Sequence, residues 1–405
     1  MSLSKSKPRL AVVSPFLDKR NGTERIAVEW ITRLQDSFEI HLYSQSVEDL
    51  DLTNIVWHRI PKFPGPHLAN FLWWFLANHL WRAWDRRIWG LRYDLVYSPG
   101  VNCLDADAVS VHIIFAEYLQ RIGGNVSAPK NGSWPTRLHR KLYYRLCTFL
   151  EKQVYTNSET FLILISQKTA KNLARFYGRH DRIAILYLGL DHQTFSPARR
   201  LQLRESARKE IGLQDGHFVV LLIGNDWRNK GVPVLVQAMA LLRDLPINLL
   251  VVSREDPAAI ESLVDHNRLA GYVRIMPPRK DVEFYYAAAD VYAGPSLEDT
   301  FALPPAEAMA CGLPVIVSAA NGTCEIMTNE QNGLILSDST NSLELAQMLR
   351  RLYEDQDLRK RLEQNAAETA GKYTWERNGR ELSMIFGDIV RRRPPGDTQT
   401  QTQEL

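Results

Sequence analysis

Short apolar runs bounded by turn residues alternate with longer helical patterns along the chain, and the scheme occurs twice. This alternation is typical of parallel sheets whose strands are connected by crossover helices. In the first half we expect strands at residues 9–16, 39–45, 94–100, 107–113 and 161–166, and helices at 22–35 and 167–178. In the second half we expect strands at 218–224, 248–253, 273–278, 291–296, 314–318 and 333–336. The pattern predicts an α/β fold with two doubly wound, Rossmann-like domains that face a central cleft.

The two halves meet near residues 185–200, where a strand gives way to a connection that contains glycine, proline and arginine. We therefore expect an N-terminal domain over residues 1–190 and a C-terminal domain over 191–372. The last residues, 393–405, are polar and low in complexity, and we expect them to be disordered.

Composition agrees with two folded domains, since the chain has 405 residues and 45% of them are hydrophobic. A formal net charge of +3 is too small to indicate nucleic acid as a partner. The four cysteines match neither a zinc pattern nor a disulfide framework, which favours a reducing compartment. We see no secretion signal and no apolar run long enough to span a bilayer, so a cytoplasmic location is expected.

Ligands of doubly wound sheets bind beyond the carboxyl ends of the strands, so the loops after the strands are the candidate sites. The loop after residues 218–224 carries Arg228 and Lys230 just before a helix, whose positive end favours an anion. Its spacing is neither that of a Walker loop nor that of a dinucleotide fingerprint. It predicts a phosphate site, with solvated surface cations as the open alternative. A second loop, at residues 17–25, contains Gly22 at the start of a helix and predicts a second approach to the same ligand.

A third loop, "PSLEDTFALPPAEAMACGLPVIVS" at residues 295–318, carries Asp299 and Glu307 on the two sides of a proline-bearing turn. We expect Asp299 at a strand end and Glu307 in the first turn of a helix that begins near Pro305. Both carboxylates then face one cleft, where they accept hydrogen bonds from the vicinal hydroxyls of a sugar or a ribose. The alternative is that Glu307 only balances the helix dipole.

This stretch resembles the donor-binding motif of the retaining glycosyltransferases of family four, which have the two-domain GT-B fold. Asp299 and Glu307 fall on the two acidic positions of that motif. Further matches are Gly22, "SVHIIF" with His112, "ILYLGLDHQTFSP", "GNDWRNKG", "YYAAADVYAGPS" and "YTWERN". By the same resemblance, a C-terminal helix over residues 373–392 crosses back to the first domain.

The resemblance also implies roles for these residues. Asp299 would hold hydroxyls of the donor sugar, Glu307 the ribose of the nucleotide, and Lys230 the charge of the departing diphosphate. Free backbone amides at the start of the helix would bind the sugar and diphosphate; they belong to Phe301, Ala302 and Leu303. His112 would contact the donor sugar or position the acceptor. The alternative is that His112 is a structural histidine.

Two positions depart from the family pattern. Asp299 stands where the family usually has glutamate, so the identity of the donor sugar does not transfer. Asn225 stands where the phosphate loop usually has arginine, and Arg228 is the candidate substitute.

The resemblance thus implies a retaining hexosyltransferase that uses a UDP- or GDP-linked sugar, without a metal ion or cofactor. We expect its acceptor to be a glycan or a lipid-linked molecule of cell-envelope polysaccharide or glycolipid synthesis, because attachment to a membrane interface through residues 70–90 would favour such an acceptor. Two other classes stay open: a nucleotide-sugar epimerase of the same architecture, and a non-catalytic two-lobed sugar-binding protein.

Residues 70–90 place five tryptophans among Arg82, Arg86 and Arg87. Aromatic residues interleaved with cations suit an anionic membrane surface, which would make the protein peripheral at the inner face of the cell membrane. A second basic and aromatic stretch follows at residues 137–155. The alternative is a pair of helices that pack their tryptophans into the first domain and turn their arginines outward.

Overall fold

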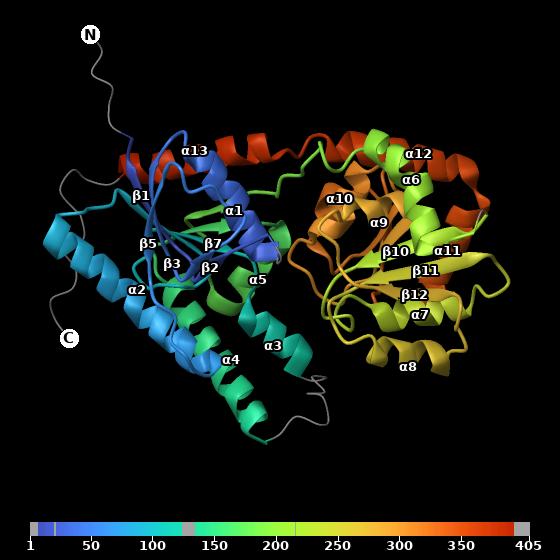
Figure 1. Cartoon of the computed structure of the whole chain (residues 1–405), viewed down its shortest axis with the longest axis horizontal. Coiled ribbons are helices and arrows are strands. Elements are labelled where there is room, and N and C mark those ends of the chain that lie inside the picture. Colours follow the sequence, from blue (N-terminus) through green and yellow to red (C-terminus); the bar gives the residue numbers. More distant parts are fainter. Residues whose placement is uncertain (1–6, 20–21, 124–133, 215, 393–405) are drawn as a thin grey trace, which may run out of the picture. The chain divides into compact units, whose positions relative to one another are not determined.

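The computed structural model describes residues 7–19, 22–123, 134–214 and 216–392, and it divides into two compact α/β units (Figure 1). The N-terminal unit extends to Tyr187 and includes the segment from Trp375 onward, whereas the C-terminal unit is Leu188–Thr374. Each unit is built on a parallel sheet, which confirms the predicted fold class. The predicted tail at 393–405 lies outside the described residues.

The N-terminal unit has a seven-stranded sheet in the order β5-β3-β1-β6-β7-β8-β9, beside a two-stranded pair, β2-β4. Its strands are β1 (Arg9–Val13), β2 (Phe16–Leu17), β3 (Glu39–Ser44), β4 (Ser46–Val47), β5 (Ile55–Arg59), β6 (Leu95–Pro99), β7 (Ala108–Val111), β8 (Phe161–Leu164) and β9 (Ile183–Ile185). Its helices are α1 (Gly22–Leu34), α2 (His67–Trp89), α3 (Phe115–Gly123), α4 (Trp134–Tyr155), α5 (Gln167–Tyr177) and α13 (Trp375–Arg392).

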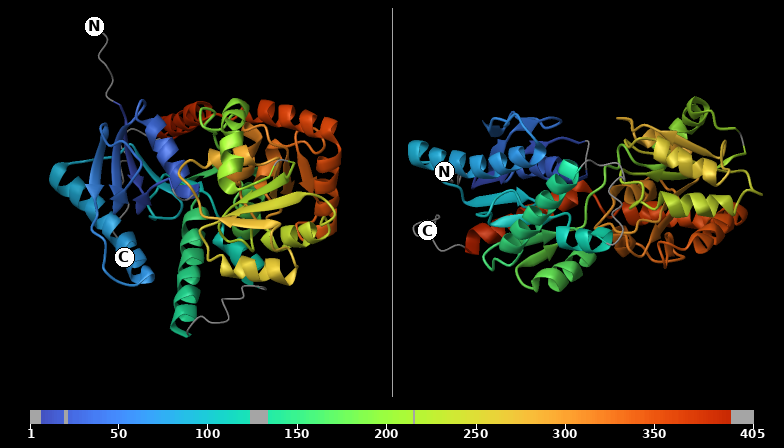
Figure 2. Two further views of the ribbon diagram at one scale, coloured as in Figure 1. Left: turned by 45° about the vertical axis from the view of Figure 1, so that its right-hand side comes forward. Right: turned by 90° about the horizontal axis from the view of Figure 1, so that it is seen from below.

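Helices cover both faces of this sheet, as Figures 1 and 2 show. Side chains of α2, α4 and α5 join one buried cluster with the strands, through Trp74, Val154 and Leu173. Helices α1 and α13 lie on the opposite face, where the rings of Trp30 and Phe386 lie 6.2 and 5.2 Å from that of Tyr97. The C-terminal helix α13 is thus part of the core of the N-terminal unit.

The orientation of helix α2 agrees with neither interpretation of residues 70–90. They do not form a surface to which all three arginines contribute, and they do not form a helix with buried tryptophans and outward arginines. Trp74 is buried, but Trp84 and Trp89 are exposed, so the tryptophans are not packed into the core as a set. Arg82 is only 3% exposed and forms an ion pair with Asp105 at 2.6 Å. Arg82 therefore does not point outward, and the expectation that it contributes to a surface is wrong.

The C-terminal unit has a six-stranded parallel sheet in the order β12-β11-β10-β13-β14-β15. Its strands are β10 (Phe218–Ile223), β11 (Ile247–Val252), β12 (Val273–Met276), β13 (Val291–Gly294), β14 (Val315–Ser318) and β15 (Leu334–Leu336). Its helices are α6 (Pro197–Ile211), α7 (Val232–Ala240), α8 (Ala258–His266), α9 (Glu283–Ala288), α10 (Leu303–Ala310), η1 (Gly322–Ile326), α11 (Ser342–Glu354) and α12 (Gln356–Ala370).

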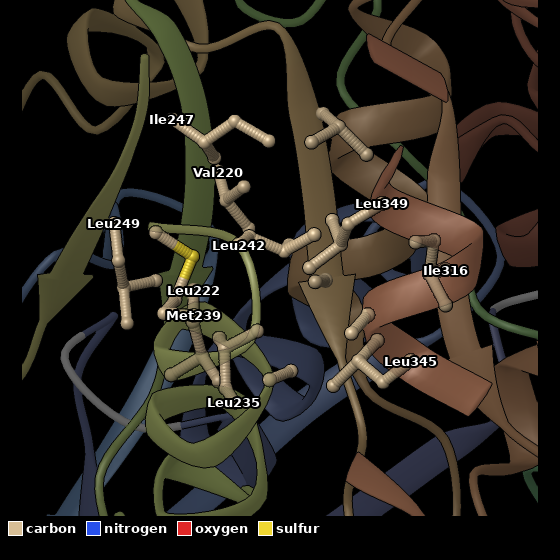
Figure 3. Close-up of a cluster of buried hydrophobic side chains, with 14 of the residues drawn as sticks. Val220, Leu222, Leu235, Met239, Leu242, Ile247, Leu249, Ile316, Leu345 and Leu349 are labelled. Carbon is tan, nitrogen blue, oxygen red and sulfur yellow. The ribbon is translucent and has the colours of Figure 1, made fainter. Parts of the chain in front are cut away.

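Aliphatic side chains fill the space between this sheet and its helices (Figure 3). Leu235 and Met239 of α7 and Leu345 of α11 meet Val220 and Leu222 of β10 in one buried cluster. Strand β10 is almost wholly apolar because parallel strands covered on both faces have no solvent-facing side. In sheets of this kind, ligands bind at the loops that follow the carboxyl ends of the strands.

Candidate active site

The strand order of the C-terminal unit reverses between β10 and β13, and the carboxyl ends of the strands at such a reversal are the usual ligand site of these sheets. Two hydrogen bonds join the loops. The amide of Leu297 donates to the carbonyl of Asn229 at 2.7 Å, and the Asn229 side chain donates to the carbonyl of Glu298 at 2.8 Å. Asn229 thus ties the two loops together, a role that no local sequence signal indicated.

Two glycines permit the close packing of these loops. Gly231 has a φ of 82°, and a Cβ atom there would lie 2.2 Å from the carbonyl oxygen of Pro295. A Cβ atom on Gly224 would lie 2.9 Å from Cγ of Lys230, because the lysine stem passes over this residue. Glycine at both positions lets the β10 loop approach the β13 loop and directs the amine of Lys230 across it.

Lys230 and Asp299 meet at this point, where the lysine Nζ donates to the aspartate Oδ2. The two side chains are 24% and 14% exposed. The backbone of Asp299 is bonded on both sides to the segment after β14: its amide donates to Ala320, and its carbonyl accepts from Gly322 at 3.0 Å. The structure therefore holds a partly buried ion pair at the carboxyl ends of β10 and β13, and hydrogen bonds fix the aspartate backbone.

Glu307 lies in the second turn of α10 and not in the first, because the helix begins at Leu303 with prolines in its first turn. The dipole interpretation is weakened, since that effect falls off within the first turn. Glu307 is 3% exposed and accepts a hydrogen bond of 2.8 Å from the hydroxyl of Tyr286 in α9. Tyr286 was missed from the sequence because its partner lies 21 positions away.

Both acids act on the buried ring of Tyr292 in β13. Burial raises the pKa of Tyr292 most, and the negative charges of Asp299 and Glu307 raise it further. Burial and the charge of Glu307 likewise raise the pKa of Tyr286. Both carboxylates therefore lie near Tyr292, and Glu307 also lies against Tyr286.

The start of α10 differs from the expectation of free amides in one respect. Phe301, Ala302 and Leu303 are all buried. The Ala302 amide donates to the hydroxyl oxygen of Thr323 at 3.1 Å, and this hydroxyl donates back to the Ala302 carbonyl at 2.7 Å. The amide of Ala302 is thus satisfied within the protein and is a poor candidate for ligand binding. Thr323, in η1, is a further residue that sequence reasoning missed.

The two candidate anion-binding residues of the β10 loop are placed differently. Asn225 accepts a hydrogen bond of 3.0 Å from the amide of Arg254, so it holds the loop that follows β11. The guanidinium of Arg228 is exposed and lies 4.9 Å from the centre of the Trp227 ring. Lys230 is the basic residue that the structure places beside Asp299.

The N-terminal unit has its own reversal of strand order, between β1 and β6. Two adjoining cavities of about 190 and 140 Å³ lie there. They share walls formed by Thr23, Phe71, Pro99, Asn102 and Tyr143. A second candidate ligand site therefore lies within this unit, lined by α2, α4 and the loops after the strands.

His112 and Gly22 belong to this region. His112 lines the smaller cavity, and its Nε2 lies 2.8 Å from the hydroxyl of Ser110, which in turn lies 2.8 Å from that of Tyr97. Burial lowers the pKa of His112 to about 4, so its imidazole is neutral at pH 7. Gly22 is the first residue of α1 and is exposed, and a Cβ atom there would meet no described atom within 4 Å.

Glu151 of α4 is a second titratable group in the wall of the smaller cavity, and the sequence did not indicate it. It accepts hydrogen bonds from the amides of Phe115 and Ala116 at the start of α3, at 2.7 and 3.3 Å. The Tyr177 hydroxyl donates a third, at 2.7 Å. Burial raises the pKa of Glu151 to about 7, against the lowering effect of these donors.

Neither a metal-binding cluster nor a membrane-spanning helix is found among the described residues. No group of three or more His, Cys, Asp or Glu side chains is arranged to hold a metal ion in the part of the chain that the structure covers. Within those same residues, no helix combines the length and the apolar character that crossing a membrane requires.

Comparison with known proteins gives matches to two family models. Residues 20–194 match the model described as Glycosyltransferase Family 4, and residues 204–369 match that described as Glycosyl transferases group 1. A D-inositol 3-phosphate glycosyltransferase of Corynebacterium urealyticum is 28% identical over 74% of this chain and 72% of its own length. One from Xylanimonas cellulosilytica is 31% identical over 60% of each chain.

Solved structures share the fold. WaaG, a glycosyltransferase involved in lipopolysaccharide biosynthesis, has a TM-score of 0.74 and 20% identity, over 93% of this chain and 99% of its own. A sucrose-phosphate synthase from Thermosynechococcus elongatus has a TM-score of 0.77 and 20% identity, over 96% of this chain and 100% of its own. Both have the GT-B architecture that the sequence predicted. The family models match most of the chain, one in each unit, and the chain belongs to the family-four glycosyltransferases.

Proposed function

We propose that this protein is a retaining hexosyltransferase. It moves a sugar from a UDP- or GDP-linked donor to a hydroxyl of a glycan or lipid-linked acceptor, in the synthesis of cell-envelope polysaccharide or glycolipid. It works in the cytoplasm at the inner face of the membrane and needs no metal ion or cofactor. The observation that carries the proposal is the Lys230–Asp299 ion pair at the carboxyl ends of β10 and β13, with both Asp299 and Glu307 near Tyr292.

The ion pair suits a donor that brings both negative charge and hydroxyl groups. When the diphosphate enters, the Lys230 amine can exchange the Asp299 carboxylate for phosphate oxygens, which carry more charge. The released Asp299 carboxylate then accepts hydrogen bonds from the sugar hydroxyls. Lys230 stabilises the charge that develops on the diphosphate as the glycosidic bond breaks, which is electrostatic catalysis without a metal ion.

The placement of the acids supports retention without an enzyme nucleophile. Asp299 is held by Lys230, and Glu307 is buried against Tyr286, so neither is arranged as the acid or nucleophile of a glycosidase pair. The acceptor hydroxyl would instead attack on the face from which the diphosphate leaves. The neutral His112 imidazole and the cavities of the N-terminal unit are the proposed acceptor side.

The comparisons favour a uridine nucleotide as the first donor to test. HepE of Anabaena, which shares the fold with a TM-score of 0.70 at 18% identity, is known in complex with UDP-glucose. The relatives called D-inositol 3-phosphate glycosyltransferases make a phosphorylated polyol hydroxyl a reasonable acceptor to include.

A panel of UDP-, GDP- and ADP-sugars, scored by thermal stabilisation, tests the proposal. A ligand present at 100 times its Kd stabilises the folded protein by about 2.7 kcal/mol, which is readily measured. We expect one nucleotide class to stabilise the wild type and to lose this effect in Lys230→Ala, whereas Lys360→Ala, an exposed lysine of α12, keeps it. If no nucleotide sugar stabilises the wild type, the proposed function is wrong.

A further inference from the structure

The outward face of α2 is an apolar stripe. Residues spaced four apart along the helix are 51–63% exposed: Leu72, Leu76, Leu80, Trp84 and Ile88. Trp89, which follows, is 75% exposed. At 1.5 Å per residue the stripe runs for roughly 24 Å. Positions four apart advance about 40° around a helix axis, so Leu72 to Trp84 span an arc of about 120° and Ile88 lies beyond it. A soluble helix normally turns its polar side outward, so an exposed apolar stripe of this length indicates a partner surface.

Buried charges on the opposite face fix this orientation. Arg82 binds Asp105 through both of its terminal nitrogens, at 2.6 and 2.8 Å, and is only 3% exposed. Asp85 accepts hydrogen bonds from Tyr43 at 2.5 Å and from His58 at 2.8 Å. Rotating α2 to hide its leucines would expel Trp74 from the core and leave these charges without partners, which is costly. The stripe is therefore held outward by the fold.

Helix α4 lies beside the N-terminal end of α2. The ring of Tyr143 lies 4.9 Å from that of His67 and 5.5 Å from that of Phe71. Helix α4 also exposes apolar side chains, at Leu138, Leu142 and Phe149, and along the same stretch it exposes the basic residues Lys141, Arg145 and Lys152. We call the outward sides of these two helices the α2–α4 surface.

The exposed, described charges of the α2–α4 surface are all positive. Among the described side chains of the two helices, every exposed charged residue is basic: Arg86, Arg87, Lys141, Arg145 and Lys152. The acids of the same helices, Asp85 and Glu151, are buried. A second copy of the chain, paired through the same surface, would bring like charges together. Apolar side chains flanked by cations instead match the acyl chains and anionic headgroups of a lipid surface.

We propose that the α2–α4 surface docks the protein on an anionic lipid bilayer. The stripe of α2 inserts its leucines and tryptophans at the level of the headgroups, and the basic residues contact lipid phosphates. The inner sides of the same two helices, through Phe71 and Tyr143, line the cavities of the N-terminal unit. A lipid-linked acceptor would then reach that unit from the docked side; this last link rests on the proposed function, whereas docking does not.

Cosedimentation with vesicles of phosphatidylcholine, with and without phosphatidylglycerol, tests the docking. The wild type is expected to bind the anionic vesicles at low salt and to bind the neutral ones far less. Leu76→Glu combined with Leu80→Glu is expected to weaken binding roughly a hundredfold or more, because two inserted apolar side chains are lost. Arg86→Gln with Arg87→Gln is expected to weaken it roughly tenfold and to reduce its sensitivity to salt.

Matched changes on the C-terminal unit serve as controls. Leu201→Glu with Leu343→Glu alters two leucines that are 71% and 58% exposed, and Lys360→Gln with Arg361→Gln removes two exposed cations of α12. Both control variants are expected to bind vesicles as the wild type does. Thermal melting and stabilisation by the donor nucleotide report whether each variant is folded, and both are independent of lipid.

Three results would overturn the inference. One is vesicle binding by the wild type that is absent or equal for neutral and anionic lipid. Another is unchanged binding in the Leu76→Glu, Leu80→Glu variant, or, if that variant does not fold, in the Arg86→Gln, Arg87→Gln variant. The third is a wild-type dimer in sedimentation that the leucine changes dissociate without an effect on vesicles, which would make the surface an interface between two copies. Loss of donor stabilisation with intact vesicle binding would count against the proposed function alone.

Discussion

The two units hold their titratable groups in opposite ways at equivalent places in their sheets. At the strand reversal of the C-terminal unit, Lys230 and Asp299 form an ion pair that is still partly exposed. At the reversal of the N-terminal unit, burial lowers the pKa of His112 to about 4 and raises that of Glu151 to about 7. The first site holds an ion pair, whereas at pH 7 the second has a neutral imidazole and a carboxyl group that is partly protonated.

This difference indicates what each site is built to bind. A pair of opposite charges can be exchanged for an anionic diphosphate and for sugar hydroxyls, so it suits a charged ligand. Buried neutral groups offer hydrogen bonds with little net charge, so they suit an uncharged hydroxyl group. The contrast agrees with a division of labour between a donor site and an acceptor site.

The largest effect on sugar transfer is expected from a change of Asp299. Asp299→Asn keeps the shape of the side chain but removes its charge, so transfer should fall about a hundredfold, as for other charged contacts to a reacting group. The ion pair adds a second expectation. Because Lys230 loses its competitor, nucleoside diphosphate should bind at least as tightly as to the wild type. Calorimetry with the diphosphate and product release with the sugar nucleotide measure the two effects.

A matched control for Asp299 breaks a surface ion pair. Asp244→Asn removes the partner of Arg350, whose side chain is 36% exposed, and should change neither quantity. Weaker diphosphate binding in Asp299→Asn would mean that the carboxylate organises the phosphate site instead of competing for it.

The next effect is expected at Glu307. Glu307→Ala removes a buried acceptor, and donor affinity should fall ten- to a hundredfold, since hydrogen bonds to a charged group contribute about 1.5–3 kcal/mol. Tyr286→Phe removes only the hydroxyl that donates to Glu307 and should weaken the donor severalfold at most. Equal affinities of Glu307→Ala and wild type for the donor, in calorimetry, would remove this residue from the proposed site.

The smallest effects concern stability and pH in the N-terminal unit. His112 has a folded pKa of about 4, below its unfolded value, so the stability it contributes is present above about pH 6.5 and is lost as the pH falls toward 4. The loss is on the order of 3 kcal/mol. Unfolding of His112→Gln, measured between pH 7 and pH 4.5, should therefore be less sensitive to acid than that of the wild type.

The stability that Glu151 contributes changes with pH in the opposite direction. Its folded pKa of about 7 lies above the unfolded value, so its contribution is present below about pH 4.5 and is lost as the pH rises through 7. Glu151→Gln should flatten the stability profile on this side only. Identical pH profiles for wild type and both variants would show that the cavity groups are not held neutral, and the contrast between the two units would disappear.

Much of the fold could be predicted from local sequence, because strands buried on both faces are continuous apolar runs. Strands β1, β3 and β10 fall within the predicted ranges. Strand β5, Ile55–Arg59, was not predicted: it lies at the edge of its sheet, and its side chains alternate irregularly between buried and exposed. We expected α10 to begin near Pro305, two residues after its actual start at Leu303. Prolines are favoured in the first turn of a helix, so they lie inside α10 and do not mark the residue at which it begins.

The candidate donor residues were also visible in the sequence, but their partners were not. Lys230 and Asp299 stand out as charged residues after apolar strands, yet their pairing joins positions 69 residues apart. Tyr286 and Thr323, which bind Glu307 and Ala302, carry no local signal of that role. Such contacts depend on which strands are neighbours in the sheet, and no periodicity encodes that order.

Helix α2 shows most clearly which features depend on the tertiary structure. The sequence by itself determined that residues 70–90 interleave tryptophans with arginines, and that two α/β units carry acids and a lysine in loops after strands, because these properties follow from composition and from periods of two and 3.6 residues. Only the tertiary structure decided which side of α2 faces the core, since apolar and charged side chains are interleaved along this helix. The pairing of Arg82 with Asp105, 23 positions away, settles it, because an unpaired buried charge is too costly to keep.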